Sequence, residues 1–285
     1  QRGMTGIERF AEIMDTPIAI ADKPDAKPLE VKQGGIEFKD VSFEYPDDHN
    51  QVLHHVNLTI RPGESLALVG PSGGGKTTLC NLIPRFYDAT GGAVCIDGVD
   101  VRDMPQATLH DLMGYVPQKG VLFSGTIDSN LKFAGEHITD EDVRTAAGIA
   151  QATEFIDAKP EGYASPIAQG GSNVSGGQKQ RLSIARAIAK KPRIYLFDDS
   201  FSALDYKTDV ALRRALKAQT DNATVIIVAQ RISTVLHANR ILVLDEGRIV
   251  GDGTHAQLME SCPEYQEIAR SQLSQKELNL SKEGE

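Results

Sequence analysis

The sequence predicts an α/β fold built around a mostly parallel sheet. A glycine-rich stretch lies between a short apolar run at residues 65–69 and a helical pattern at residues 77–83. In the second half of the chain, apolar runs alternate with helical segments, which favours parallel strands joined by helices. Near the beginning, apolar and polar residues alternate at 36–45 and 56–60, and this alternation indicates antiparallel strands with one wet face.

The remaining elements follow in a regular order. Further strands are expected at residues 93–96, 114–116, 193–197, 224–228, 240–244 and 248–251. Helices are expected at residues 141–150, 153–158, 176–190 and 204–218. Strand patterns vanish between residues 120 and 170, so a helical insert is predicted to interrupt the α/β core.

Composition also predicts where the domain begins and ends. Residues 5–14 place apolar side chains on one face of a helix, and a proline-containing stretch ending in Gly34-Gly35 is typical of a linker. A polar tail closes the chain. We therefore expect a helix end and linker at 1–30, one domain at 31–275 with a helical subdomain at about 120–190, and a flexible tail at 276–285.

The composition is that of an ordinary globular protein and excludes some functions. The chain has 285 residues, 24% of them charged, with a formal net charge of −9. An acidic chain without a Lys/Arg-rich run argues against nucleic-acid binding. Cys80, Cys95 and Cys262 form no C-x-x-C pair and are expected to be reduced thiols. Because no apolar run approaches the roughly 18 residues of a membrane span and the chain opens on Gln1, we expect a soluble piece of a longer protein.

The glycine-rich stretch fits the pattern G-x-x-x-x-G-K-[ST], which is the phosphate-binding loop. Its predicted nucleotide-binding residues are Gly70, Ser72, Gly73, Gly74, Gly75, Lys76, Thr77 and Thr78. Glycines let the backbone approach phosphates closely, Lys76 would reach the β- and γ-phosphates, and the Thr77 hydroxyl would ligate Mg²⁺. A chance match occurs in roughly one chain in a hundred of this length. The strand and helix on either side make chance a poor explanation, so we predict nucleotide binding.

Two other segments carry chemistry in this context. The apolar run at 193–197 ends in Asp198-Asp199, and a buried strand would deliver Asp198 beside the phosphate loop to hold Mg²⁺. Ser175-Gly176-Gly177-Gln178 opens a helix with an N-cap serine and exposed backbone N–H groups, which suit a phosphate. In isolation, the first is equally a strand end with solvated acids, and the second a capped glycine-rich loop.

Together these motifs resemble the nucleotide-binding domain of an ATP-binding cassette (ABC) transporter of the exporter type. The resemblance covers residues 36 to about 270 and includes a signature at 175–178 about 100 residues after the phosphate loop. Tyr45 stands where the family stacks an aromatic ring on adenine, although an exposed strand aromatic is the plainer alternative. Gln118 matches the glutamine that contacts Mg²⁺ and senses the membrane domain; residues 122–127 and 202–205 match further family motifs.

The resemblance implies a P-loop NTPase of the ABC type, with a RecA-like mostly parallel core, an antiparallel β subdomain and a helical subdomain. It implies an ATPase that uses ATP and Mg²⁺ at the cytoplasmic face of a membrane. Residues 1–30 would be the end of the last helix of a fused transmembrane domain and its linker. Two such domains would form a head-to-tail dimer, in which Ser175, Gly176, Gly177 and Gln178 complete the partner's ATP site.

This chain departs from the family pattern at three places. The catalytic glutamate is Asp199, whose side chain is shorter by one CH₂, about 1.5 Å. The switch histidine is Gln230, which can donate a hydrogen bond to a γ-phosphate but cannot take up a proton. The nearby His237 is expected on a surface helix and is no substitute. Finally, residues 168–171 read Ala-Gln-Gly-Gly where exporters usually carry Gly-Glu-Arg-Gly, so the acidic residue that usually contacts the membrane domain is replaced.

Because Asp199 and Gln230 are altered while Lys76, Asp198 and the signature are intact, we expect one half of a heterodimeric exporter. Its own site would hold ATP and hydrolyse it weakly, and its signature would serve the competent site of a different partner chain. The alternatives are a homodimeric exporter ATPase with slow turnover and an ATP-dependent regulatory module. DNA-repair or translation ATPases of the same superfamily would need coiled-coil inserts or basic faces, and the sequence has neither. An importer ATPase docks to a separate membrane subunit, whereas the expected opening helix and linker favour a fused membrane domain.

Overall fold

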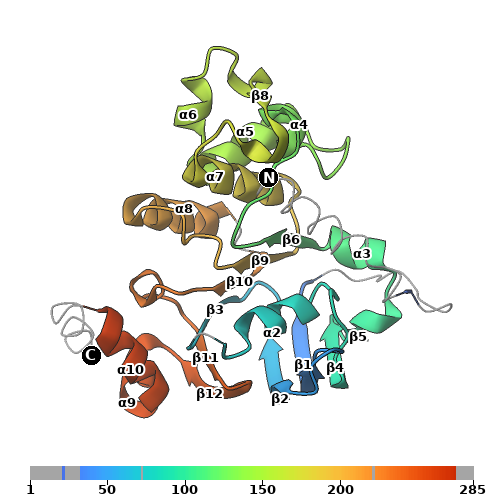
Figure 1. Ribbon diagram of the computed structural model, residues 1–285, viewed down its shortest axis with the longest axis vertical. Helices are drawn as coiled ribbons and strands as arrows, with labels where there is room; N and C mark the ends of the chain where they lie inside the picture. Colours follow the sequence, from blue (N-terminus) through green and yellow to red (C-terminus); the bar gives the residue numbers. More distant parts are fainter. Residues whose placement is uncertain (1–20, 23–32, 72, 220–221, 274–285) are drawn as a thin grey trace.

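The computed structural model describes residues 21–22, 33–71, 73–219 and 222–273. Its centre is a six-stranded sheet in the order β12-β11-β3-β10-β9-β6, in which only β12 runs antiparallel to its neighbour. The strands in that order are Arg248–Gly253, Ile241–Asp245, Ser65–Val69, Thr224–Val228, Ile194–Asp198 and Met113–Val116. The carboxyl ends of β3, β9 and β10 therefore meet at one edge (Figure 1).

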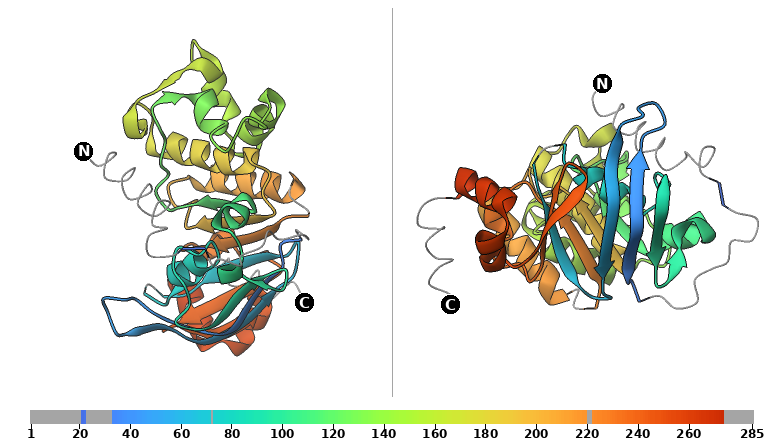
Figure 2. Two further views of the ribbon diagram at one scale, coloured as in Figure 1. Left: turned by 90° about the vertical axis from the view of Figure 1, so that its right-hand side faces the viewer. Right: turned by 90° about the horizontal axis from the view of Figure 1, so that it is seen from below.

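A second, antiparallel sheet lies beside the first, with the order β2-β1-β4-β5. Its strands in that order are Gln51–Ile60, Ile36–Glu44, Gly91–Ile96 and Val99–Asp100. Figure 2 shows β1, β2 and β4 running side by side when the molecule is seen from below. The pairing Ile36↔Ile60 and Phe38↔Leu58 puts apolar side chains of β1 and β2 on the same buried face.

The helices form one group beyond the β6 edge and others that lie along the two sheets. Those beyond the β6 edge, drawn at the top of Figure 1, are α4 (Ile127–Leu131), α5 (Asp140–Ile149), α6 (Thr153–Asp157) and α7 (Gly176–Ala189). The others are α2 (Lys76–Leu82), α3 (Gln106–Asp111), α8 (Tyr206–Gln219), α9 (His255–Ser261) and α10 (Pro263–Gln272). Short 3₁₀ turns occupy Val101–Asp103, Gly162–Ala164, Gln169–Gly171 and Ile232–Thr234, and a two-stranded ladder joins β7 (Gly125–Thr126) to β8 (Pro166–Ile167).

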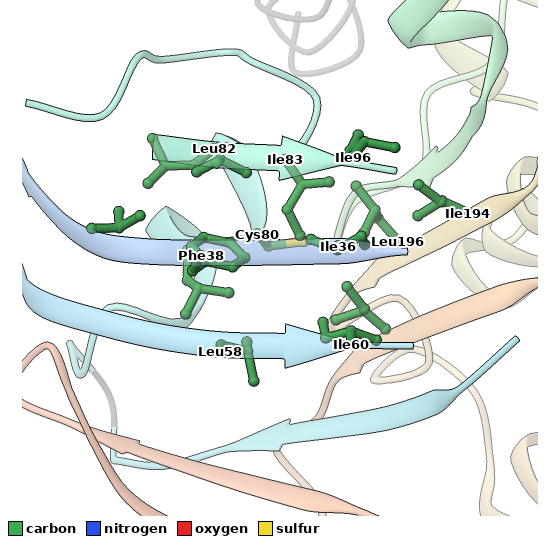
Figure 3. Close-up of a cluster of buried hydrophobic side chains, with 14 of the residues drawn as sticks. Ile36, Phe38, Leu58, Ile60, Cys80, Leu82, Ile83, Ile96, Ile194 and Leu196 are labelled. Atoms are coloured by element: carbon green, nitrogen blue, oxygen red, sulfur yellow. The ribbon is translucent and has the colours of Figure 1, made fainter. Parts of the chain in front are cut away.

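The main core holds α2 between the two sheets. Figure 3 shows Cys80, Leu82 and Ile83 from the end of α2 among side chains from both sheets, including Phe38 of β1 and Leu196 of β9. All five are at most 1% exposed. Since truncating such a buried residue to alanine typically costs about 2–5 kcal/mol, this packing fixes the helix that follows the phosphate loop.

Most predicted elements match the structure, and four expectations need correction. The strands at 65–69 and 224–228 are matched residue for residue, and the sheet is mostly parallel as expected. The insert does contain strands, because β7 and β8 pair over only two residues each, too few for a periodic pattern. His237 is exposed in a turn, not on a helix. The strand expected at 56–60 is longer, because β2 begins at Gln51. Helices α3, α4, α9 and α10 were not expected.

The expected opening helix, most of the linker and the tail at 276–285 lie outside the described residues. Within the described parts of the chain, no helix combines the length and the apolar character needed to cross a membrane.

Candidate nucleotide-binding site

The predicted site residues gather where the central parallel strands end. The phosphate loop follows β3, Asp198 ends β9 and Asp199 follows it, and Gln230 lies after β10. Because β10 lies between β3 and β9, these three chain segments leave the sheet side by side. Ligands of open α/β sheets bind outside the carboxyl ends of the strands, so this edge is the candidate site.

The phosphate loop needs glycine at specific positions. Gly70 has φ +153°, and a Cβ there would lie 2.0 Å from the Leu244 carbonyl oxygen. Gly75 has φ +99° and begins α2 without a side-chain cap. A hydrogen bond from the Gly247 N–H to the Gly74 carbonyl, 2.9 Å long, ties the loop to the turn after β11. Only glycine at these positions allows the loop to fold back so closely. Ser72, the remaining predicted residue of the loop, lies outside the described residues.

Lys76 lies inside this loop with its ammonium group held ready. The side chain is 5% exposed, and its Nζ donates a 2.6 Å hydrogen bond to the Gly70 carbonyl. Burial lowers the pKa of Lys76, and the charges of Asp199 and Asp198 oppose that shift. A buried ammonium group that is hydrogen-bonded to a backbone carbonyl gains a charge-assisted hydrogen bond when a phosphate binds beside it.

Thr77 and Asp198 bring together the oxygens that a magnesium ion would use. The Thr77 hydroxyl donates to Asp198 Oδ1 over 3.2 Å, and Asp198 is 7% exposed. Burial raises the pKa of Asp198, while the Thr77 bond and Lys76 lower it. No cluster of three His, Cys, Asp or Glu occurs among the described residues. One hydroxyl and one carboxylate nevertheless fit Mg²⁺, because this ion takes few protein ligands and completes its shell with phosphates and water.

Asp199 occupies a strained position directly after Asp198. Its φ is +53°, its N–H donates 2.9 Å to the Val228 carbonyl, and it is 8% exposed. Burial raises the pKa of Asp199, and so does Asp198, whereas Lys76 and Arg231 lower it. A left-handed conformation costs energy outside glycine and is often found at functional sites.

Gln230 and Gln118 are exposed and lie in the segments that follow β10 and β6. The Gln230 carbonyl accepts a 2.9 Å hydrogen bond from Gln272 Nε2, and Gln272 Oε1 accepts one of 2.8 Å from the Ile232 N–H. The switch loop is therefore held by the last described helix, α10. Gln118 follows β6, the neighbour of β9. Sequence reasoning did not find Gln272, because this contact joins segments 42 residues apart.

Tyr45 lies at the end of β1 next to the phosphate-loop helix. Its hydroxyl is 2.8 Å from the Thr78 hydroxyl. Its ring meets Phe43 and Tyr87 edge-on, with centroids 4.8 and 5.2 Å away. Tyr45 is half-buried and Tyr87 is 37% exposed, so aromatic surface is available beside the loop.

The predicted signature lies elsewhere. Ser175 caps α7: its hydroxyl accepts from the Gln178 N–H, and the Gln178 side chain accepts from the Ser175 N–H. A Cβ on Gly176 would meet no atom within 4 Å, so this helix start is open to the surroundings. Of the described residues, none of the signature hydrogen-bonds to the phosphate loop, and α7 lies beyond β6 while α2 packs against β2, β9 and β10 (Figure 1).

A parallel sheet that sets a phosphate loop beside a buried strand ending in aspartate defines a P-loop NTPase. The family model for the ABC transporter matches residues 53–202, more than half of the sequence, and the chain belongs to this family. The matched residues include β4, β5 and the helices beyond β6.

Known relatives agree with this assignment. An uncharacterised ABC transporter ATP-binding protein of Mycobacterium tuberculosis is 43% identical over 269 residues, covering 93% of this chain and 46% of the relative. The ATP-dependent lipid A-core flippase of Desulfotalea psychrophila is 42% identical, with coverage of 93% and 46%. A solved structure of a bacterial Atm1-family ABC exporter with ATP bound superposes with a TM-score of 0.85 at 37% identity, covering 95% of this chain and 48% of that one. The chain thus spans about half the length of the curated relatives it matches.

Proposed function

We propose that this chain is the ATPase domain of an ABC exporter and drives movement of a substrate across a membrane. The observation that carries this proposal is the buried Lys76 inside a glycine loop, next to the Thr77–Asp198 pair. Similarity to a lipid A-core flippase and to a putative multidrug export protein of Staphylococcus aureus supports the direction of transport. The chain would act at the cytoplasmic face of the membrane.

Different residues of the chain would bind the different parts of the nucleotide. The loop glycines, Lys76 and the hydroxyls that follow it would hold the phosphates, and Tyr45 would carry the base. Asp198, Thr77 and Gln118 would hold Mg²⁺, which when bound neutralises the charge that builds up on the phosphates. Asp199 would orient the attacking water, and Gln230 would donate a hydrogen bond to the γ-phosphate.

The open start of α7 supports a head-to-tail dimer of two such domains. A helix start whose backbone N–H groups face outward is suited to an anion brought by another molecule. Ser175, Gly176, Gly177 and Gln178 would therefore complete the ATP site of a partner domain. In this proposal residues 31–275 form the ATPase domain, with a helical subdomain at about 120–190, and residues 1–30 lead from a fused transmembrane domain.

Asp199 and Gln230 favour a partner that is a different chain. A carboxylate retracted by about 1.5 Å falls outside the roughly 2.6–3.2 Å that a general base needs. Gln230 cannot share a proton at the γ-phosphate. The site formed by this chain would then retain ATP, while the site completed by its signature turns it over. A homodimer with slow turnover is the second candidate, because Asp199 keeps the negative charge.

Turnover as a function of protein concentration separates these candidates. Purified chain is assayed for Mg-ATP hydrolysis over a wide concentration range, with ATP binding measured in parallel. Tight binding with background turnover supports a weak half-site, whereas turnover that climbs steeply with concentration means self-dimerisation and removes the heterodimer proposal. A chain that binds no ATP at all contradicts the proposed function itself.

A second experiment restores the family residues. In the complete heterodimer, the double substitution Asp199→Glu with Gln230→His is expected to raise turnover and shorten ATP retention at this site, because it returns a base of full length and a titratable switch. If neither quantity changes, the weak-site proposal is wrong.

A further inference from the structure

A cluster of three charged side chains lies behind the loops that carry Asp199 and Gln230. Asp209 of α8 is completely buried, at 0% exposure. It accepts a 2.5 Å hydrogen bond from Nε of Arg213, one turn along the same helix, and a 2.8 Å bond from Nη2 of Arg231. A buried carboxylate of this kind is costly unless its oxygens are paired, so the position of Arg231 is strongly fixed.

Arg231 contacts more than Asp209. The same Nη2 atom lies 2.7 Å from the Phe201 carbonyl oxygen and 3.2 Å from that of Leu204. The guanidinium carbon of Arg213 lies 4.5 Å from the centre of the Phe201 ring, so the second arginine also contacts this segment. Nη2 of Arg231 thus contacts both the backbone of residues 201–204 and the buried carboxylate of Asp209.

The residues that Arg231 connects are close in the chain to the proposed site residues Gln230 and Asp199. Arg231 directly follows Gln230, and the segment 201–204 begins two residues after Asp199. The loop after β10 and the loop after β9 therefore meet at Nη2 of Arg231, close in the chain to the two residues that we propose for the γ-phosphate. Gln272 holds the same switch loop independently, through the Gln230 carbonyl and the Ile232 N–H.

We propose that Arg231 is a positioning residue, which fixes the switch loop against the segment after Asp199 so that Gln230 can recognise a γ-phosphate. The proposal rests on the proposed nucleotide site and adds that this site distinguishes ATP from ADP through Arg231. Arg231 itself touches no phosphate in this scheme. Its effect passes through the backbone that it holds in place, which is why rotating or releasing that backbone alters only the γ-phosphate contact.

The test compares affinities for two nucleotides. Dissociation constants for Mg-ADP and for a Mg-bound non-hydrolysable ATP analogue are measured on the full chain and on the variants Arg231→Ala, Arg231→Lys and Gln230→Ala. We expect Gln230→Ala to reduce the preference for the ATP analogue about tenfold, the size of one hydrogen bond to a charged group. Arg231→Ala is expected to reduce this preference at least about threefold with Mg-ADP affinity unchanged. A double variant, Gln230→Ala with Arg231→Ala, is expected to lose no more of the preference than Gln230→Ala alone.

Arg231→Lys guards against a folding failure, because lysine keeps a positive charge beside Asp209 but lacks the guanidinium fork. The matched control is Arg240→Gln. Arg240 also binds two carboxylates, Glu64 and Asp252, and one carbonyl, that of Thr59, at the opposite end of the same sheet. We expect the control to leave the ratio of the two affinities unchanged, even if it lowers the melting temperature.

The outcomes separate the two proposals. If the unmodified chain binds neither nucleotide, the proposed function fails and Arg231 is not the reason. If the chain binds both nucleotides and folded Arg231→Lys and Arg231→Ala keep the full preference for the ATP analogue, the positioning role is wrong. A loss of both affinities in equal proportion would also overturn it, since that result reports a purely structural contribution.

Discussion

The Tyr45 hydroxyl lies 2.8 Å from the Thr78 hydroxyl, so the aromatic side chain at the end of β1 is hydrogen-bonded directly to the phosphate-loop helix. This bond joins the antiparallel sheet to the parallel core at the candidate site. It holds the Tyr45 ring beside the phosphate loop, in a position where a base could stack on it.

Two substitutions at Tyr45 separate its ring from its hydroxyl. Tyr45→Phe keeps the aromatic face but removes the bond to Thr78, so we expect a loss of stability of about 1 kcal/mol and nucleotide affinity within about twofold of the original. Tyr45→Ala removes the stacking surface and is expected to weaken ATP binding about tenfold or more. Titration calorimetry and thermal unfolding measure both effects; equal affinity in Tyr45→Ala would show that the ring does not carry the base.

Asp198 gives a prediction about metal dependence. Asp198→Asn keeps the shape and the contact with Thr77 but removes the negative charge that suits Mg²⁺. We expect Mg²⁺ to strengthen nucleotide binding to the original chain and to have little effect on the variant. Nucleotide affinity is measured with Mg²⁺ and with a chelator. An Asp198→Asn chain whose affinity still responds fully to Mg²⁺ would place the ion on other residues.

Elements of the fold that are encoded by a short local pattern could be predicted from the sequence, and elements that depend on distant contacts could not. The strands at 65–69 and 224–228 are continuous apolar runs and were predicted to the residue. Helices α9 and α10 carry local start signals, an N-cap at Thr254 and a proline at Pro263, that the sequence reasoning passed over. By contrast, β7 and β8 are too short for any period, and their pairing depends on the fold around them.

The site divides in the same way. The phosphate loop and Asp198 have a local pattern, and the structure brings them together as Thr77 and Asp198 meet across 121 residues. Of the Arg231 cluster, only Asp209 and Arg213 could have been found, because they stand four residues apart on a helix. The contacts of Arg231 with 201–204 and of Gln272 with the switch loop depend on tertiary packing and leave no periodic trace.

Asp209 gives a prediction about stability. Removing one partner of a buried ion pair leaves an uncompensated charge, which typically costs about 3–5 kcal/mol. We expect Asp209→Ala to destabilise the chain by about this amount, because burial already lowers the pKa of Arg213 and Asp209 is the main group that opposes the shift. Urea unfolding measures the change in free energy.

The control for Asp209 is an acidic residue in a more exposed pair. Asp252 binds Arg240 over 2.8 Å with its side chain 42% exposed. Exposed ion pairs contribute about 0–1 kcal/mol, so Asp252→Ala is expected to change stability by no more than that. If the two variants unfold at the same urea concentration, the Asp209 cluster does not stabilise the fold in the way its burial implies.

His255 predicts how stability depends on pH. Its Nδ1 lies 2.6 Å from the Tyr265 hydroxyl, it is 5% exposed, and its Nε2 has no hydrogen-bond partner among the described residues. Burial lowers the pKa of His255 below its ordinary 6.5, and His237 lowers it further. The unfolded chain therefore binds the proton more readily than the folded one. The contribution to stability is complete above pH 6.5 and is lost as pH falls from there through the lowered folded pKa.

We expect the free energy of unfolding to fall between about pH 7 and about pH 5.5, with His255 contributing at most about 1.4 kcal/mol per pH unit. His255→Gln keeps a polar side chain near Tyr265 but cannot titrate, so its stability should fall less steeply over this range. Urea unfolding of both chains at several pH values gives the two slopes. His237→Gln is the control: His237 is exposed in its turn, and its removal should change the slope much less. Parallel slopes for the original chain and His255→Gln would mean that the fall in stability comes from other groups, because a buried histidine that resists protonation must steepen the dependence on pH.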